Sequence, residues 1–337
     1  MPQKQAPAVS RLRLTRAEPK AITFGVSPVE IALGPVELST ADGVQAGSAR
    51  ARVYDFGAVS LLLRCPISDV PWSGLVNRVI ALDRAAMATP LWPELLGRAQ
   101  ALIAPAMVRP GEVTVEEDYF ITTLQHLDRP VTADELLATV DLVPLLSGER
   151  HALSEGARAD LLRNRFSYYP TDLAVVTWDH AVLLEPTGER DVGDVLEVAN
   201  AQLLELRYYD ELLDAELPRM YARVEETRRV GGGLARRRYA GLARSLYTLV
   251  AEVTETTERV DNALKVTEDV YLARIYGAAL ELFRVAAWGA AVQRKLAIIR
   301  DTYTALYDEA GTSRAELLEI AIVVLIVIEL VLALLRR

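Results

Sequence analysis

Cysteine and histidine are scarce in this chain of 337 residues, which has one cysteine, Cys65, and three histidines. A single cysteine excludes an intramolecular disulfide bond and a cysteine-rich zinc site. The histidines His126, His151 and His180 lie too far apart in sequence, from one another and from Cys65, for the short spacing of a helical metal site. The sequence therefore predicts no metal ion and no cofactor.

Familiar signatures of catalysis are also missing. The chain has no G-x-x-x-x-G-K-[ST] phosphate loop and no G-x-S-x-G nucleophile motif. The glycines at residues 231–233 follow a predicted helix, so we interpret them as a turn. The acidic residues 116–118 lie on a predicted strand, where consecutive side chains point to opposite faces. We therefore predict no catalytic residues and no small-molecule substrate. An enzyme with an unrecognised site in the N-terminal domain is an alternative.

A general basic excess is absent, because the net charge is -9. This balance argues against wholesale binding of nucleic acid, which usually requires a basic surface. Residues 1–20 contain several arginines but lack the apolar core of a secretory signal. We therefore expect a disordered basic arm there and a cytoplasmic location for the soluble part. Arginine greatly outnumbers lysine, and alanine, leucine and valine are abundant, which we interpret as a bacterial composition.

Residues 21–188 change their hydrophobic period often, which predicts an α+β domain. Residues 51–65 are rich in β-branched and aromatic side chains and predict one buried central strand. Helices are expected at residues 71–83 and 91–107, each beginning near a proline. Residues 113–125 predict another strand.

The rest of this domain carries local signals for a helix start and a hairpin. Thr132 is followed three residues later by Glu135, which predicts a capping box at the start of a helix. Residues 166–169 and 173–184 are expected to form short antiparallel strands. Asp179 would lie in the turn of the second stretch, because aspartate tolerates tight turns.

Residues 189–312 predict a long coiled-coil-like helical domain. Apolar residues recur at alternating steps of three and four in two segments separated by the glycines, which favours an antiparallel helical hairpin. Asp210 is a polar position in the seam and is expected to set its register. The predicted hairpin or oligomer seam consists of Leu203, Leu206, Asp210, Leu213, Leu246, Leu249 and Val253. Residues 270–307 would pack as a third helix of the bundle, or alternatively form an oligomer interface.

The last predicted segment, residues 314–337, is a C-terminal membrane anchor. Residues 317–335 include 17 apolar residues out of 19. Their aliphatic side chains favour insertion by about 7 kcal/mol, and two acids oppose it by less than about 6 kcal/mol. The anchor residues that we single out are Leu317, Ile320, Leu325, Ile328, Glu329 and Leu335. A helix buried in a soluble oligomer is the alternative, because Glu329 is easier to accommodate in a protein interface.

An arginine cluster at the predicted hairpin tip is the remaining candidate site. Its members are Arg228, Arg229, Arg236, Arg237 and Arg238. The functional interpretation is a docking site for RNA, acidic lipid headgroups or an acidic protein face. The alternative is a solvated helix end, whose cations interact favourably with the helix dipole.

Four patterns in order resemble the "required for meiotic nuclear division" family, a domain of unknown function. They are the aromatic-glycine stretch at residues 54–59, the acidic-then-aromatic stretch at 115–120, the hairpin at 174–184, and the Leu-Glu and Ile-Glu pattern of residues 316–330. The resemblance implies a membrane-associated, oligomerising, non-catalytic protein. In mitochondria, members of that family support translation at the inner membrane.

Together these features predict a non-enzymatic, tail-anchored, self-associating scaffold. We expect it at the bacterial inner membrane, as a homo-oligomer with its soluble part in the cytoplasm. An RNA- or ribosome-associated factor that uses the arginine-rich tip is the first alternative.

Overall fold

The computed structural model describes residues 23–24, 27–107, 115–229, 240–251, 253–254, 264–265 and 269–335. The chain forms two compact units, of which the first comprises Met1–Leu206 and Arg259–Ala286. The second comprises Arg207–Glu258 and Ala287–Arg337. The first unit is α+β and the second is helical in the described parts, so the predicted combination of an α+β region and a helical region is confirmed.

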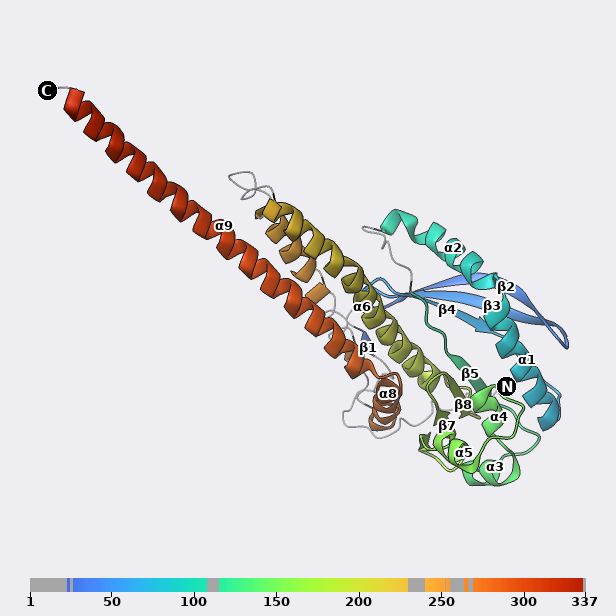
Figure 1. Cartoon of the computed structure of the whole chain (residues 1–337). Coiled ribbons are helices and arrows are strands. Elements are labelled where there is room, and N and C mark those ends of the chain that lie inside the picture. The colour runs from blue at the N-terminus through green and yellow to red at the C-terminus, as the bar shows by residue number, and fades with distance from the viewer. Residues whose placement is uncertain are drawn as a thin grey trace, which may run out of the picture. The chain divides into compact units, whose positions relative to one another are not determined.

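The first unit contains an antiparallel sheet of β2 (Val29–Thr40), β3 (Gly43–Val53) and β4 (Val59–Arg64) in that order. One face of this sheet is apolar and packs against α2 (Leu91–Ile103), which lies beside it in Figure 1. The buried side chains of this layer are Leu33, Val36, Ala49, Ala51, Leu95 and Ala99. Because side chains alternate along a strand, the residues between these positions on β3 form a second, polar face.

The prediction of one strand over residues 51–65 is wrong. The Tyr54 amide donates to the Ala58 carbonyl at 3.0 Å, and the Gly57 amide donates to the Tyr54 carbonyl at 3.1 Å. Gly57 has a φ of 102°, a conformation that favours glycine. This turn reverses the chain, so β3 and β4 are neighbours in one sheet and Val53 pairs with Val59.

A second sheet has the order β5-β8-β7-β6 and comprises β5 (Phe120–Leu124), β6 (Arg165–Phe166), β7 (Leu173–Val176) and β8 (His180–Leu184). β5 runs parallel to β8, and the other pairs are antiparallel. The predicted hairpin is confirmed, with Asp179 in the turn before β8. All residues of β7 and β8 are buried, which is typical of strands covered on both faces.

Described helices that pack into the core of this sheet are α1 (Trp72–Ala88), α3 (Ala133–Thr139), α4 (Val143–Ser147) and α5 (Glu155–Leu161). The predicted capping box is confirmed, because the Glu135 amide donates to the Thr132 hydroxyl and the Thr132 amide donates to the Glu135 carboxylate. α1 ends five residues later than predicted, at Ala88 rather than at residue 83.

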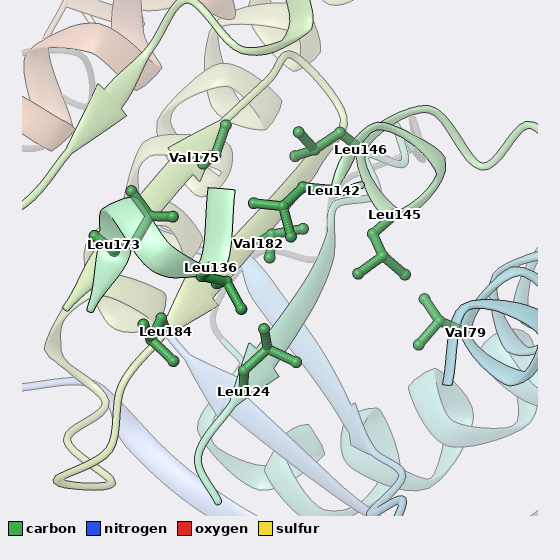
Figure 2. Close-up of a cluster of buried hydrophobic side chains, with 11 residues drawn as sticks. Val79, Leu124, Leu136, Leu142, Leu145, Leu146, Leu173, Val175, Val182 and Leu184 are labelled. Atoms are coloured by element: carbon green, nitrogen blue, oxygen red, sulfur yellow. The ribbon is translucent and has the colours of Figure 1, made fainter. Parts of the chain in front are cut away.

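The main core of the first unit lies between this sheet and its helices. Figure 2 shows its side chains converging from α1, α3, α4 and the strands. The labelled members are Val79, Leu124, Leu136, Leu142, Leu145, Leu146, Leu173, Val175, Val182 and Leu184. Leu146 is completely buried, at 0% exposure.

Long helices begin at Asp191. α6 (Asp191–Arg229) has 39 residues and is followed by a helical segment over residues 240–251 and 253–254. β9 (Leu264–Lys265) pairs with β1 (Thr23–Phe24). The predicted third helix over residues 270–307 is instead two helices, because Arg284 adopts a left-handed φ of 56° between α8 (Val270–Leu282) and α9 (Val285–Leu335). α9 then continues through residue 313, where a domain boundary was predicted.

The described helices of the second unit share one core. Side chains from α6, from residues 240–251 and 253–254 and from α9 meet in it, whereas α8, the first part of the predicted third helix, belongs to the first unit. Its buried members include Leu213, Met220, Leu246, Val253, Val292, Leu296 and Ile299.

Replacing a fully buried leucine of the main core should reduce stability strongly. We expect Leu146→Ala to lower the free energy of unfolding by about 2–5 kcal/mol, because it removes apolar contacts and leaves a cavity. Chemical denaturation followed by circular dichroism would measure the change. Leu102→Ala is the matched control, because Leu102 is 61% exposed and should lose less than about 1 kcal/mol. Equal losses in the two variants would contradict this description of the core.

Candidate functional site

The apolar end of α9 is the first candidate site. Its described side chains are Ile322, Val323, Val324, Leu325 and Ile326, which are 49–64% exposed. An α-helix turns about 100° per residue, so five consecutive residues cover every face of the helix. A helix that is apolar on all sides is normally surrounded by protein or by lipid. This segment, which we call the apolar end, therefore has the character of a surface that requires an apolar partner.

The other residues predicted for the anchor lie in the same helix. Leu317, Ile320, Ile328, Glu329 and Leu335 belong to the helical backbone of α9, and their side chains are outside the described part of the structure. In the part of the chain that the structure describes in full, no single helix is long and apolar enough to cross a membrane. A bent pair, Val270–Leu282 with Val285–Tyr307, meets the requirement by length and composition alone. We do not assign this pair to a membrane, because α8 buries Leu272 and Ile275 within the protein.

The predicted arginine cluster falls outside the described side chains. Arg228 and Arg229 are the last two residues of α6, and Arg236, Arg237 and Arg238 belong to residues 230–239, which the structure does not describe. Docking of an anion at these residues stays a prediction.

The predicted seam residues occupy buried or partly buried positions. Leu213, Leu246 and Val253 lie in the core of the second unit, with Leu249 packed against it. Leu203 and Leu206, on the part of α6 that belongs to the first unit, are also buried. The seam residues on the second unit therefore contact one another within one chain.

Asp210, the polar position of the seam, forms an ion pair that the sequence reasoning missed. Lys295 Nζ of α9 lies 2.6 Å from an oxygen of Asp210 and 2.6 Å from an oxygen of Asp214. Burial lowers the pKa of Lys295, but hydrogen bonds to the two carboxylates outweigh it and raise that pKa. The sequence contains a signal for this ion pair, because a carboxylate in an apolar seam requires a cation from a facing helix.

A larger, partly buried ion-pair cluster joins the polar face of the first sheet to the start of α6. The Arg52 guanidinium donates to Glu30 at 2.8 Å and to Glu197 at 2.7 Å. It also donates to Asp194 at 3.2 Å, and the Tyr54 hydroxyl donates to the second oxygen of Glu197 at 3.0 Å. We call this group the Arg52 cluster.

The electrostatics of the Arg52 cluster keep the arginine charged. Burial lowers the pKa of Arg52, but the carboxylates of Glu197, Glu30 and Asp194 outweigh it and raise that pKa. Burial raises the pKa of Glu197, and the charge of Arg52 opposes this effect. Burial and the adjacent Glu197 carboxylate also raise the pKa of Tyr54. The cluster is suited to holding α6 on the sheet.

Sequence reasoning did not find the Arg52 cluster, although a signal existed. Arg50 and Arg52 alternate with small apolar residues on a strand, so both belong to one face. Asp191, Asp194 and Glu197 recur every three residues at the start of a helix and so share one side of it. Two matching charged surfaces of this kind favour pairing.

A third polar cluster surrounds His180. Its Nδ1 lies 3.1 Å from Asp179, and its Nε2 lies 3.4 Å from Asp83 of α1. Burial lowers the pKa of His180, but its interactions with Asp179 and Asp83 outweigh burial and raise the pKa to about 9. Asp118 is nearby, and burial together with the charges of Asp179 and Asp83 raises its pKa. The imidazole is therefore a cation at neutral pH.

The surroundings of His180 are closely packed. A Cβ added at Gly148 would lie 2.9 Å from an oxygen of Asp83, and Gly148 has a φ of 62°. Across the described part of the chain, no three or more His, Cys, Asp and Glu side chains are arranged to hold a metal ion. The cluster is thus an ion pair between α1 and β8.

The N-terminal part of the chain matches a known family model. The model is described as "Uncharacterized protein MJ0711, N-terminal domain" and covers residues 2–191. The uncharacterised protein MJ0711 of Methanocaldococcus jannaschii is 27% identical over 194 residues, which is 57% of this chain and 58% of that protein. The chain thus aligns with less than two thirds of its archaeal relative. No solved structure matches it. These matches support a domain family of unknown function and do not single out the meiotic-division family.

Removing the cation of the Arg52 cluster should destabilise the first unit. Arg52→Met leaves the buried carboxylate of Glu197 without its cation, so we expect the free energy of unfolding to fall by about 3–5 kcal/mol. Urea denaturation would measure this fall in the free energy of unfolding. The double variant Arg52→Met, Glu197→Met should recover part of the loss. In the control Arg163→Met, the broken pair with Asp160 is exposed, and the change should be below about 1 kcal/mol. Equal losses in the two single variants would contradict a buried ion pair.

The charge of His180 should make stability depend on pH. Its folded pKa of about 9 exceeds the unfolded value of 6.5, so the stabilisation is complete below pH 6.5 and is lost as the pH rises through 9. Each pKa unit of difference corresponds to about 1.4 kcal/mol. NMR of labelled histidine should show one imidazole that titrates near pH 9 and is missing from His180→Gln. Asp83→Asn should lower that pKa. An unchanged pKa in Asp83→Asn would refute the ion pair.

Proposed function

This chain belongs to the family of the uncharacterised protein MJ0711, N-terminal domain, and we propose that it is a non-enzymatic scaffold anchored in a membrane by residues 317–335. In this proposal the α+β region and the helical core remain in water, and copies of the chain associate through their helices. The apolar end of α9 is the observation that carries the proposal.

The geometry of α9 supports an anchor. The helix is continuous for 51 residues, which corresponds to about 76 Å at 1.5 Å per residue. Leu306 is the last described core residue on it, at 5% exposure, and the apolar end begins 16 residues later. Residues 317–335 would extend over about 28 Å, close to the roughly 30 Å of a bilayer's hydrocarbon core.

Energetics favour insertion by a small margin only. The aliphatic residues of 317–335 contribute about -7 kcal/mol, and Glu319 and Glu329 together cost less than about 6 kcal/mol. Acids within a membrane usually face a neighbouring helix and pair there. Association of several helices would compensate for the short span and would give Glu329 a neighbouring helix to pair with. We therefore propose anchoring and self-association as one function.

The location forms part of the proposal. We place the chain at the inner membrane of a bacterial cell with its soluble part in the cytoplasm. The resemblance of residues 54–59 and 316–330 to the meiotic-division family supports a membrane-associated and non-catalytic role, because that is what the resemblance implies.

A charge in the apolar end tests the proposal. Leu325→Arg removes a favourable leucine and adds an arginine near the centre of the span, at a cost of roughly 3–4 kcal/mol. This exceeds the margin for insertion. We expect the wild type to stay in the membrane pellet after a carbonate wash and most of the variant to be released. Leu102→Arg is the matched control, because Leu102 of α2 is also exposed, at 61%; it should remain in the pellet.

Two results would overturn the anchor. One is release of the wild-type chain by carbonate, and the other is equal retention of Leu325→Arg and Leu102→Arg. Light scattering on the released protein would then distinguish the alternative, because a helix buried in a soluble oligomer requires a mass of several copies. Light scattering in detergent should likewise give more than one copy for the anchored protein, and a single copy would contradict self-association.

A further inference from the structure

A small basic depression lies beside the Arg52 cluster, on the polar face of the first sheet. Its volume is about 80 Å³, and all its lining residues belong to the first unit. It is lined by Glu30, Arg50, Ala51, Arg52, Leu62, Arg64, Arg190 and Asp194. We call it the arginine pocket. Nothing in the proposed anchoring function uses it.

Strand geometry explains how the arginines come together. Arg50 and Arg52 are two residues apart on β3, so their side chains lie on the same face. Arg50 pairs with Leu62 of β4, which places Arg64 diagonally across from it on that face. Arg190 immediately precedes α6 and is brought in because the Arg52 cluster holds the start of that helix on the sheet.

The charges of the pocket are unequal. Four guanidinium groups line it against two carboxylates, Glu30 and Asp194, and both carboxylates bind Arg52. Arg50 lies 3.8 Å from Glu30, so it shares a carboxylate that is already bound. Within the described ranges, Arg64 and Arg190 have no ion pair. Glu197 adds a third carboxylate to Arg52 from outside the lining, so the pocket and this partner together carry an excess of one positive charge.

This excess has an energetic consequence in the empty pocket. Burial lowers the pKa of Arg64, and the neighbouring charges of Arg190 and Arg50 lower it further. A site whose own cations repel one another gains stability when an anion enters, because the anion attracts each of them. Repulsion between neighbouring cations, with the lowered pKa that it causes, is typical of functional sites that bind an anion.

We propose that the arginine pocket binds the phosphoryl group of a phosphate monoester. The negative charge of a monoester would neutralise the excess positive charge of the pocket. The planar fork of an arginine side chain donates two parallel hydrogen bonds to a phosphate, which suits several arginines around one group. A volume of about 80 Å³ suits a single phosphoryl group, whereas a nucleic-acid strand requires an extended groove. The same chemistry is found in soluble metabolites and in the headgroup of phosphatidic acid.

Titration calorimetry on the full-length chain in detergent tests the proposal. The probes are glycerol 3-phosphate for a soluble ligand and dihexanoyl phosphatidic acid for a lipid headgroup, and the tighter of the two identifies the source. We expect one site per chain, with affinity that falls as salt concentration rises. Arg64→Gln and Arg190→Gln should each weaken binding at least tenfold. Arg78→Gln, which changes an exposed arginine of α1 in the same unit, should bind as the wild type does.

Thermal unfolding gives a second readout, and the melting temperature without ligand also shows whether each variant is folded. A ligand that binds only the folded state raises its melting temperature, so glycerol 3-phosphate should stabilise the wild type and Arg78→Gln but not Arg64→Gln. Without ligand, Arg64→Gln should melt at or above the wild-type temperature, because it relieves repulsion. Absence of binding to the wild type, or equal binding by Arg64→Gln and Arg78→Gln, would overturn the proposal. Neither result bears on the anchor, which depends on residues of the second unit.

Discussion

The ion pair between Arg52 and Glu197 is the interaction on which the arrangement of the first unit depends. It joins a strand to the second turn of α6, and both side chains are largely buried, with exposures of 12% and 10%. Neither charge is tolerable without the other in such surroundings. The pair therefore holds the start of α6 on the polar face of the sheet, where α6 supplies Asp194 and the residue before the helix is Arg190. The arginine pocket is a direct result of this fixed position.

The same principle, a buried charge that requires one particular partner, recurs in both units. His180 is held between Asp83 and Asp179 and ties α1 to β8. Lys295 is held between Asp210 and Asp214 and ties α9 to α6. Apolar side chains in a helical seam tolerate a shift by one turn, whereas a partly buried lysine between two carboxylates opposes such a shift. The apolar contacts provide most of the stability, and these ion pairs select one register among several that apolar contacts alone would permit.

Local features of the fold were predictable from sequence, and long-range ones were not. The capping box of Thr132 and Glu135 and the hairpin turn at Asp179 depend on residues a few positions apart. The turn after Tyr54 was missed because its aromatic neighbours favour a strand, and only Gly57 indicated otherwise. The partners Arg52 and Glu197 are separated by 145 residues, so no spacing rule relates them. A helix over residues 322–326 was predictable from their apolar composition, whereas their insertion into a membrane stays a prediction.

The unbroken course of α9 has a mechanical consequence. Its first half is fixed by core contacts such as Val292 and Ile299, and no break separates that half from the apolar end. A helix of this kind bends only slightly over its length, so it transmits tilt and rotation. If the apolar end enters a bilayer, a thinner or thicker membrane would change its tilt, and the helix would carry that torque to the Lys295 ion pair. A change in bilayer thickness would then alter the contacts of Lys295, because the rigid helix connects the two.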